Sequence, residues 1–264
     1  MPGWKQNGGC SGTPNIKGTK VVPAPTLTMP PSNGQLKAVA DYVYTGNRCL
    51  DFKSNGSFDM YTNITCTGTA TNVAPSGASV IYVDHSGACS GGYQYIQKYN
   101  NPATCGDVAV KGTYARNFTV GAANDVIIRG NLQKSGDTMM GLVANNFVRV
   151  YHPVTRDSSN NCTGNAAGTL SNPQIEAAIL ALQQSFIVDN WDCGATLGSL
   201  TVTGAIAQKW RGPVGTGSGG GATTGYVKDY NYDDRLRYKS PPQFLDPVQS
   251  AWRTVRRSEL QPAK

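Results

Sequence analysis

Three adjacent residues, Asp84, His85 and Ser86, are the residue types that a hydrolytic triad uses. The acid, the base and the nucleophile of a working triad must converge in space, and consecutive residues rarely do so. Their segment is rich in Gly and Ser, so we interpret His85 as a surface imidazole. The second histidine, His152, precedes a proline and is assigned a structural, hydrogen-bonding role. Because the chain has only two His and no CxxC pair, we predict no catalytic residues, no metal site and no cofactor.

Acidic residues could supply a different chemistry, either a carboxylate pair for glycoside hydrolysis or a Ca²⁺ site. Catalytic carboxylates must lie a defined distance apart in space, which a sequence does not show. The chain has neither an EF-hand loop nor the Gly-rich nonapeptide repeat that binds Ca²⁺. We therefore interpret the following residues as solvated turn aspartates: Asp51, Asp59, Asp84, Asp107, Asp125 and Asp137.

Seven cysteines are spread along the chain at spacings that favour local disulfides. Each such bridge would close a short loop and contribute about 3 kcal/mol by the chain-entropy argument. Disulfides imply an oxidising compartment, so we expect a secreted or cell-surface protein. The preferred pairs are Cys49–Cys66, Cys89–Cys105 and Cys162–Cys193. Cys10 is left over, and either its partner lies upstream in a longer precursor or it is a free thiol.

Short apolar runs bounded by Gly or Asn, such as 126–128 and 147–151, indicate strands. Gly112 and Gly130, which lie 18 residues apart, each occupy an apolar-x-Gly-x-apolar step, and Gly204 occupies a third. Strands repeated at this spacing, with Gly where the chain turns a corner, favour stacked coils that share one core. The sequence therefore predicts a mostly β fold with a right-handed parallel β-helix or solenoid-like core.

Two segments carry helix patterns. Over 173–188, an Asn-Pro pair precedes apolar residues that recur every three or four positions, which predicts an amphipathic helix. One helix in a β protein usually covers an open face or end of the sheet, so we interpret this helix as a cap. A capping box at Ser32 predicts a shorter helix with Leu36, Val39 and Ala40 on its buried side.

Composition divides the chain into three parts. Residues 1–31 are rich in Gly and Pro and should be extended, and residues 32–208 should form the solenoid-like domain. Residues 209–264 begin with the Gly-rich loop 212–225, expected to be flexible, and continue as a long irregular tail that packs on the core. The candidate surface-binding residues of this tail are Tyr226, Tyr230, Tyr232, Arg235, Arg237, Tyr238 and Trp252.

The formal net charge of +7 is concentrated at the C-terminal end, because residues 209–264 carry +5 of it. A basic end can meet an acidic partner, a polyanionic surface or nucleic acid. We interpret it as a solvated tail and do not expect nucleic acid as a partner. No run of 18 apolar residues occurs, so no membrane span is expected.

Four segments, 141–153, 177–194, 200–216 and 225–248, resemble the C-terminal part of actinobacterial surface proteins with a prepilin-like N-terminus. Those proteins are grouped with PilX-type pilus assembly components. The stretches YNYDDRLRY and SPPQFLDPV in the last segment are the most distinctive, and residues 25–40 also fit. The resemblance implies a pilus- or envelope-associated β-solenoid with other pilus or envelope proteins as partners. The prepilin helix has no counterpart here, so membrane insertion through it is not expected.

We therefore expect a non-enzymatic extracellular protein with a structural or adhesive role. Two alternatives remain. One is a polysaccharide lyase or glycoside hydrolase on a β-helix, whose groove would hold clustered carboxylates or Arg and Lys beside Ca²⁺. The other is a carbohydrate-binding module, which would present coplanar exposed Tyr and Trp as stacking platforms for glycans.

Overall fold

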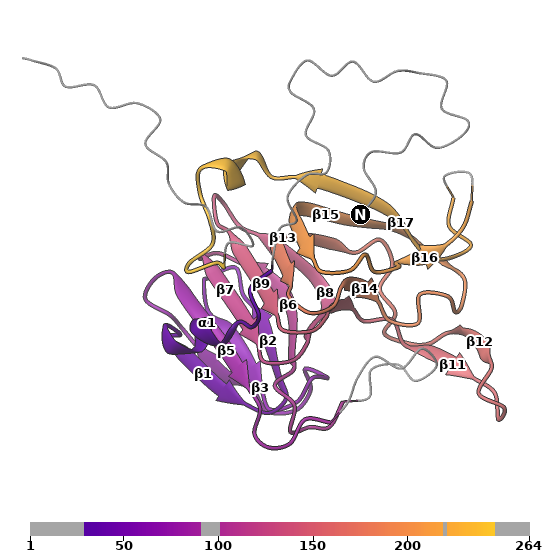
Figure 1. The fold of residues 1–264 in the computed structure, drawn as a ribbon, viewed down its shortest axis with the longest axis horizontal. Helices are drawn as coiled ribbons and strands as arrows, with labels where there is room; N and C mark the ends of the chain where they lie inside the picture. The colour runs from indigo at the N-terminus through magenta and orange to yellow at the C-terminus, as the bar shows by residue number, and fades with distance from the viewer. Residues whose placement is uncertain (1–28, 91–100, 219–220, 246–264) are drawn as a thin grey trace, which may run out of the picture.

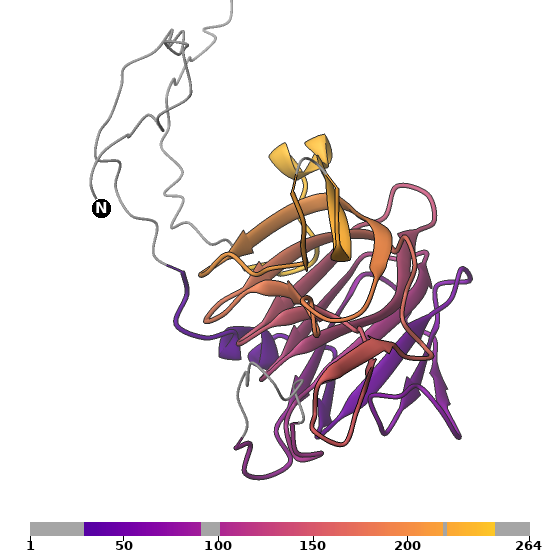
Figure 2. The ribbon, with the colours of Figure 1, turned by 90° about the vertical axis from the view of Figure 1, so that its right-hand side faces the viewer.

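The computed structural model describes residues 29–90, 101–218 and 221–245, and these are mostly β (Figure 1). The chain rises from β1 at one end of the molecule to β17 at the other, and the sheet curls as it does so (Figures 1 and 2). In this part of the chain, 15 strands join in one mixed sheet and two strands form a separate hairpin. The prediction of a mostly β fold is therefore confirmed, whereas the sheet is mixed and not purely parallel.

Most strands are paired in parallel rows. The first row comprises β1 (Tyr42–Thr45), β5 (Ser79–Asp84), β7 (Phe118–Ala122), β9 (Met140–Ala144), β13 (Gln174–Ala181) and β15 (Thr196–Gln208). The second comprises β2 (Arg48–Phe52), β6 (Val108–Tyr114), β8 (Val126–Lys134), β10 (Val148–Val150) and β14 (Phe186–Val188). The last strand of the sheet, β17 (Thr224–Tyr232), pairs in parallel with β15.

Antiparallel pairs lie at the margins of these rows. At one end, β3 (Phe58–Tyr61) and β4 (Thr71–Val73) follow β2, and at the other β16 (Gly215–Thr216) pairs with β17. The separate hairpin consists of β11 (Val154–Arg156) and β12 (Cys162–Asn165). The large sheet is mixed because of the antiparallel strands β3, β4 and β16, and the hairpin is not part of it.

Strands of the rows bury side chains on both faces. Along β8, Val126 and Ile128 belong to the main core, whereas Ile127 points the other way and packs with Cys49 and Ala109. Successive side chains of a strand point to opposite faces, so a run without polar residues indicates a strand that is covered on both sides. This explains why 126–128 is apolar throughout.

The segment 173–188 is two strands, β13 and β14, and the predicted capping helix is wrong. Ile179 faces the main core, while Leu180 and Leu182 belong to a second apolar cluster on the outer face. A strand that is apolar on both faces produces the same short-range recurrence as a buried helix, so periodicity alone does not separate them. Far from capping an edge, β13 lies inside the sheet between β9 and β15.

The α-helix of the described residues is α1, Gly34–Ala38, close to where a short helix was predicted. Leu36 is buried as expected, but Val39 is 49% exposed. The predicted capping box at Ser32 does not form, because Asn33 is the N-cap residue and makes no side-chain cap bond. The Asn33 amide instead donates to one carbonyl of β7 and one of β9, at 2.7 and 3.0 Å, which ties the helix to the sheet.

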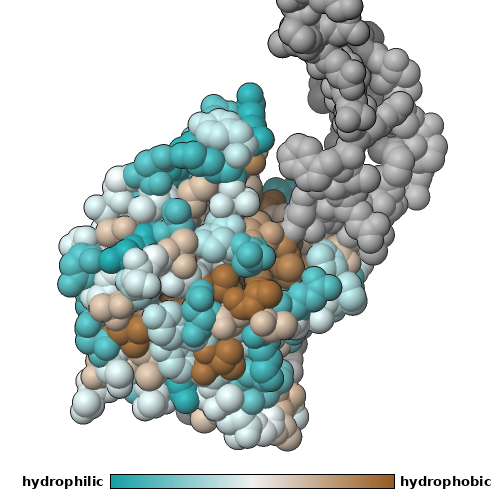
Figure 3. Space-filling model, turned by 90° about the vertical axis from the view of Figure 1, so that its left-hand side faces the viewer, coloured by the Kyte–Doolittle hydropathy of each residue, from teal (hydrophilic) through white to brown (hydrophobic). Residues whose placement is uncertain are grey.

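The face that carries α1 is partly apolar. Figure 3 shows hydrophobic residues gathered toward the middle of this side of the molecule, with hydrophilic residues around them. The outer apolar cluster joins Leu36 of the helix to Val143 and Leu180 of the sheet, and Phe244 of the C-terminal segment packs against it. The helix and the C-terminal segment therefore cover the outer face of the first row.

The C-terminal part is more regular than predicted. It begins as strand β17 and continues as the 3₁₀-helix η1, Asp234–Arg237. Part of the Gly-rich loop 212–225 is also ordered, since β16 pairs with the start of β17. Residues of the tail up to 245 contact the sheet: Thr119 of β7, for example, donates to the Pro242 carbonyl.

All three predicted disulfides are present. Cys49–Cys66, Cys89–Cys105 and Cys162–Cys193 have Cα–Cα distances of 5.3, 4.7 and 5.7 Å, respectively. Cys10, Trp252 and most of segment 1–31 lie outside the described residues. Among the residues that are described, no helix has the length and apolar character needed to cross a membrane.

Candidate functional site

The residues of the candidate triad are engaged separately. The Nδ1 atom of His85 accepts the backbone N–H of Gly106 at 3.0 Å, so this nitrogen cannot also act as a base toward Ser86. Asp84 pairs with Lys37 and accepts the backbone N–H of His85, but does not orient its ring. His85, interpreted as a surface imidazole, is half-buried, and these bonds give its ring a structural role.

One cluster has the composition of a metal site. Ligand atoms of His85, Cys89 and Cys105 lie within 4.8 Å of one another. The two cysteines are joined as a disulfide, however, and metals are bound by thiolates. In the oxidised protein this cluster offers one imidazole, whose Nδ1 is already bonded, and is therefore not a metal centre.

The tyrosines predicted as surface-binding residues divide into two groups. Tyr226 is buried, and its hydroxyl donates to the Leu170 carbonyl at 2.7 Å, so its assignment to the surface is wrong. Tyr230, Tyr232 and Tyr238 are 42%, 56% and 73% exposed. These three remain accessible to a partner.

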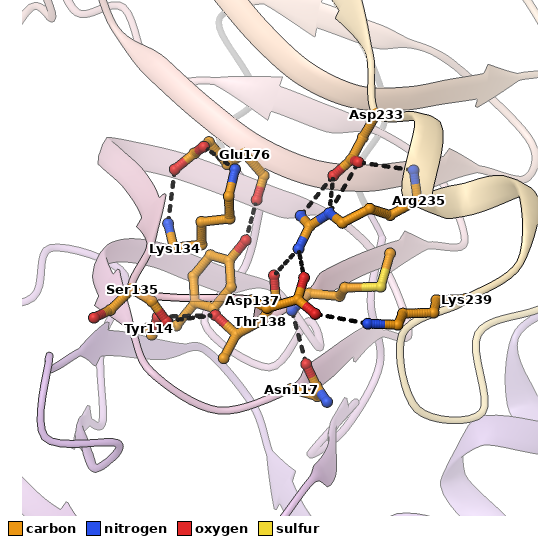
Figure 4. A network of polar contacts seen from close by, with 11 residues as sticks. Tyr114, Asn117, Lys134, Ser135, Asp137, Thr138, Glu176, Asp233, Arg235 and Lys239 are labelled. Atoms are coloured by element: carbon orange, nitrogen blue, oxygen red, sulfur yellow. Dashed lines mark hydrogen bonds and ion pairs between the residues drawn. The ribbon is translucent and has the colours of Figure 1, made fainter.

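The basic residues of the tail serve mainly as a clamp, which Figure 4 shows. The guanidinium of Arg235 bonds Asp233 and reaches across to Asp137, and Lys239 bonds the second oxygen of Asp137 at 2.6 Å. Hydrogen bonds from Lys239 and then Arg235 lower the pKa of Asp137 to about 2. Asp137, interpreted as a solvated turn residue, thus anchors the tail, while Arg237 pairs with Asp234 at the surface.

A charged triad lies inside the second row. Arg149 of β10 places Nε 3.1 Å from Asp125 and Nη1 2.8 Å from Asp189, and none of the three residues is more than 4% exposed. Burial raises the pKa of both carboxyl groups, and to about 7 for Asp189. Because two carboxylates share a single cation, one of them holds its proton more tightly. Interpreting Asp125 as a solvated turn aspartate was wrong.

Asp189 is the less well satisfied of the two carboxyl groups. Asp125 also accepts the backbone N–H of Phe147 at 3.0 Å and the amide of Asn101 at 3.2 Å. Asp189 accepts Arg149 through Oδ2, but its Oδ1 is buried and has no hydrogen-bond partner. A proton is therefore best placed on Asp189.

A polar ladder runs beside this triad through the turns that precede the second-row strands. Asn124 donates to Asp107 at 2.6 Å, and Asn146 donates to Asn124 at the same distance. Asp107 is fully buried, so it too is not the solvated turn residue that the sequence suggested. The hydrogen bonds of this ladder link the turns that precede β6, β8 and β10, and in this way they satisfy buried polar groups.

The triad borders a cavity of about 360 Å³. Arg129 of β8 lines it with its guanidinium stacked on Tyr151, 3.6 Å from the ring centroid. Arg156 enters from the β11–β12 hairpin and donates to the Asn160 carbonyl at 3.0 Å and to Asn190 at 3.1 Å, whereas its buried Nε has no partner. Asp189, with its free Oδ1, lines the same cavity. The cavity is thus lined by Arg129, Arg156 and Asp189, and each of these side chains has polar atoms without a hydrogen-bond partner in the described residues.

His152 forms part of the cavity wall and is fully buried. Its Nδ1 lies 3.0 Å from the Asp189 carbonyl, to which it donates, and its Nε2 lies 3.0 Å from Oδ1 of Asn165. The predicted hydrogen-bonding role of His152 is confirmed. The ring fixes the backbone of Asp189 and links it to the hairpin, and both nitrogens are occupied.

Sequence reasoning missed this site because its charged residues come from separate segments. The one available signal was a charged residue, Arg149, in the middle of the apolar run 147–151. A charge within a doubly covered strand must be paired, but the partners Asp125 and Asp189 cannot be read from the sequence. No family model, curated protein or solved structure matches the chain.

Proposed function

We propose that this protein is a non-enzymatic extracellular β-solenoid that serves as a rigid structural or adhesive module of pili or of the cell envelope. The observation that carries this proposal is the register of the second row, in which Val108, Val126, Val148 and Phe186 pair in one line. A chain that returns repeatedly to the same line behaves as stacked coils. The usual hand of parallel crossovers makes the proposed coil right-handed.

Two further features support stacked coils. The ladder of Asp107, Asn124 and Asn146 repeats a polar turn at equivalent places of successive passes. The antiparallel strands β3, β4 and β16 lie at the ends of the rows, where a solenoid needs protection of its first and last coils. On this proposal the coils themselves are parallel, and the sheet is mixed because antiparallel strands are added at its two ends.

The disulfides support the extracellular location. They close loops with sequence separations of 16, 17 and 31 residues, and bridges of this size persist in oxidising compartments. Each contributes about 3 kcal/mol in the chain-entropy account. Such bonds suit a domain that must keep its shape outside the cell.

The pilus or envelope association rests on the resemblance to PilX-type surface proteins. The most distinctive stretch of that resemblance, residues 230–238, holds the tail to the sheet through Arg235 and Asp137. This stretch therefore has a packing role that a family of similar folds would retain. The exposed Tyr230, Tyr232 and Tyr238 lie in the same stretch and could contact a neighbouring envelope protein or a glycan.

Fractionation of the native source tests the proposal. Pili, envelope, culture medium and cytosol would each be probed with an antibody, and the protein mapped by non-reducing peptide mass spectrometry. We expect it in the pilus or envelope fraction with the three local disulfides intact. Recovery from the cytosol with free thiols would contradict both the location and the role.

The enzymatic alternative is tested separately, by incubating the purified protein with acidic and neutral polysaccharides and measuring reducing ends and unsaturated products. Turnover would favour a lyase or hydrolase. The carbohydrate-binding alternative predicts saturable glycan binding that is lost when Tyr232 and Tyr238 are replaced by Ala. Binding without turnover that survives these replacements would point to another surface.

A further inference from the structure

We propose that the cavity between β8, β10 and the β11–β12 hairpin is a binding site for a sugar-sized molecule that carries a carboxylate, such as a uronic acid residue of an acidic glycan. This inference goes beyond the proposed structural role and does not depend on it. It rests on the charge balance, the unsatisfied polar groups and the size of the cavity.

The charge balance favours a small anion. Arg149 is compensated by Asp125 behind it, which leaves Arg129, Arg156 and Asp189 around the cavity. Within the described residues, no ion pair joins Arg129 or Arg156 to a carboxylate. The cavity therefore carries an excess of positive charge, whichever form Asp189 adopts. The excess is +1 when Asp189 is ionised and +2 when it is protonated, so a monoanion is accommodated in both forms, whereas a dianion would repel the ionised Asp189 carboxylate.

The unsatisfied groups match the hydrogen-bonding needs of a carboxylate. The guanidinium carbon of Arg129 lies 3.6 Å from the centroid of the Tyr151 ring, and within the described residues no hydrogen bond or ion pair engages its N–H groups, which can therefore bond two oxygens side by side. The Nε of Arg156 and the Oδ1 of Asp189 are buried without partners. Buried polar groups are normally bonded, so these two atoms call for a partner, a water or a ligand group, that the described residues do not supply. A protonated Asp189 would donate through Oδ1, and an ionised one would accept from a hydroxyl.

The walls fit one sugar ring. A volume of about 360 Å³ lies at the small end of ligand pockets, which span about 300–1,000 Å³. Ile64, Ile127, Pro153 and Val154 add apolar surface to the same cavity. A pyranose likewise combines apolar and polar surface, because its C–H faces are apolar and its substituents are polar. The Tyr151 ring is covered by Arg129, so the apolar contacts come from aliphatic side chains.

Two disulfides fix the walls of the cavity. Ile64 belongs to the loop closed by Cys49–Cys66, and the hairpin with Arg156 is tied down by Cys162–Cys193. Preorganised walls lower the entropic cost of binding, since few side chains must be ordered when the ligand enters. The cavity is therefore part of the rigid scaffold and not a gap between mobile loops.

Isothermal titration calorimetry with four probes tests the proposal: glucuronate, glucose, acetate and inorganic phosphate. We expect glucuronate to bind best, acetate more weakly, and glucose not measurably, because the carboxylate and the ring each contribute. Phosphate binding more tightly than glucuronate would overturn the carboxylate assignment. Absence of glucuronate binding at millimolar concentration would overturn the site.

Variants locate the binding. Arg129→Met and Arg156→Met should each weaken glucuronate binding about tenfold or more, because each removes charge-assisted hydrogen bonds. Arg129→Lys should fall between wild type and Arg129→Met, since it keeps the charge and loses the planar fork. The matched control is Arg237→Met, which removes an exposed arginine 72% accessible at its side chain. Equal affinity in the two cavity variants and this control would contradict the proposal.

Folding of each variant is checked by its thermal unfolding transition and its disulfide map. Loss of binding in a cavity variant that unfolds at the wild-type temperature supports the site directly. If Arg156→Met unfolds early, Arg156→Lys provides the second test, because it retains the cation and lacks Nε. Unchanged affinity in Arg156→Lys would contradict the proposed hydrogen bond from Nε.

Discussion

Replacing Asp189 by Asn should remove much of the pH dependence of the free energy of unfolding. The residue is only 4% exposed, and burial raises the pKa of its carboxyl group to about 7 against the attraction of Arg149. In the unfolded chain an Asp has a pKa of about 3.9. The folded protein therefore binds a proton at Asp189 over a pH range in which the unfolded chain has released it.

The difference between the folded and unfolded pKa of Asp189 sets the direction in which the free energy of unfolding changes with pH. A group whose pKa is raised by folding contributes stability that is fully present below the unfolded pKa and is lost as pH rises through the folded pKa. The loss therefore extends from about pH 4 to about pH 7 for Asp189. Between about pH 4.5 and pH 8 it covers a window of about 2.5 pH units, each of about 1.4 kcal/mol, so the free energy of unfolding should fall by about 3 kcal/mol.

Urea unfolding followed by circular dichroism at these two pH values measures the effect. The amide that replaces the carboxyl group in Asp189→Asn would be neutral at both, and Arg149 would then be paired with Asp125 alone. The variant should equal the wild type near pH 4.5 and exceed it near pH 8. Asp157→Asn is the control, because Asp157 is an exposed hairpin residue whose pKa is lowered by hydrogen bonds from Asn161. A wild-type pH slope that persists in Asp189→Asn would refute the placement of the proton.

Three other perturbations test the scaffold. Replacing both Cys49 and Cys66 by Ala should lower the free energy of unfolding by about 3 kcal/mol, measured by urea titration without reductant. Gly112→Ala should cost at least about 2 kcal/mol, because φ is +104° and a Cβ would lie 2.2 Å from a carbonyl of β2. Gly136→Ala, at φ +74° with open space around it, should cost only about 1 kcal/mol, and equal costs would contradict the steric argument. Asp137→Asn should speed tryptic cleavage of the tail at η1, because it removes the charge that Arg235 and Lys239 share and leaves Arg235 paired with Asp233 of the tail itself, and an unchanged rate would show that other contacts hold the tail.

Strands and disulfides were predictable because their signals are local. The runs 126–128 and 147–151 are β-branched or aromatic and end at Gly or Asn, and both contribute to strands of the sheet. The cysteine pairs could be inferred because each joins residues that are near in sequence. Gly112 was expected where a coil turns a corner, but it lies inside β6, at an irregularity with positive φ where the register shifts between Val110 and Gly112.

The predictions that failed concern residues whose surroundings are supplied by segments distant in the sequence. A helix was predicted over 173–188 because the sequence does not show that α1 and the C-terminal segment cover Leu180 on the outer face of the sheet. The aspartates were interpreted as solvated because turns are usually at the surface, yet Asp107 and Asp125 lie in turns that stack inside the molecule. The cavity joins residues from 64 to 190, and such a convergence exists only once the fold is known.

The order of the disulfides has a consequence for how the chain is made. The three bridges join cysteines that are consecutive among the six paired ones, so no loop encloses or interleaves with another. As the chain emerges N-terminus first, Cys49 and Cys66 can join before Cys89 appears, and Cys89 and Cys105 before Cys162. Each early bridge is then the native one, although six thiols allow many pairings. For these six cysteines an oxidant alone would suffice, whereas an interleaved pattern needs thiol–disulfide exchange to undo its first products.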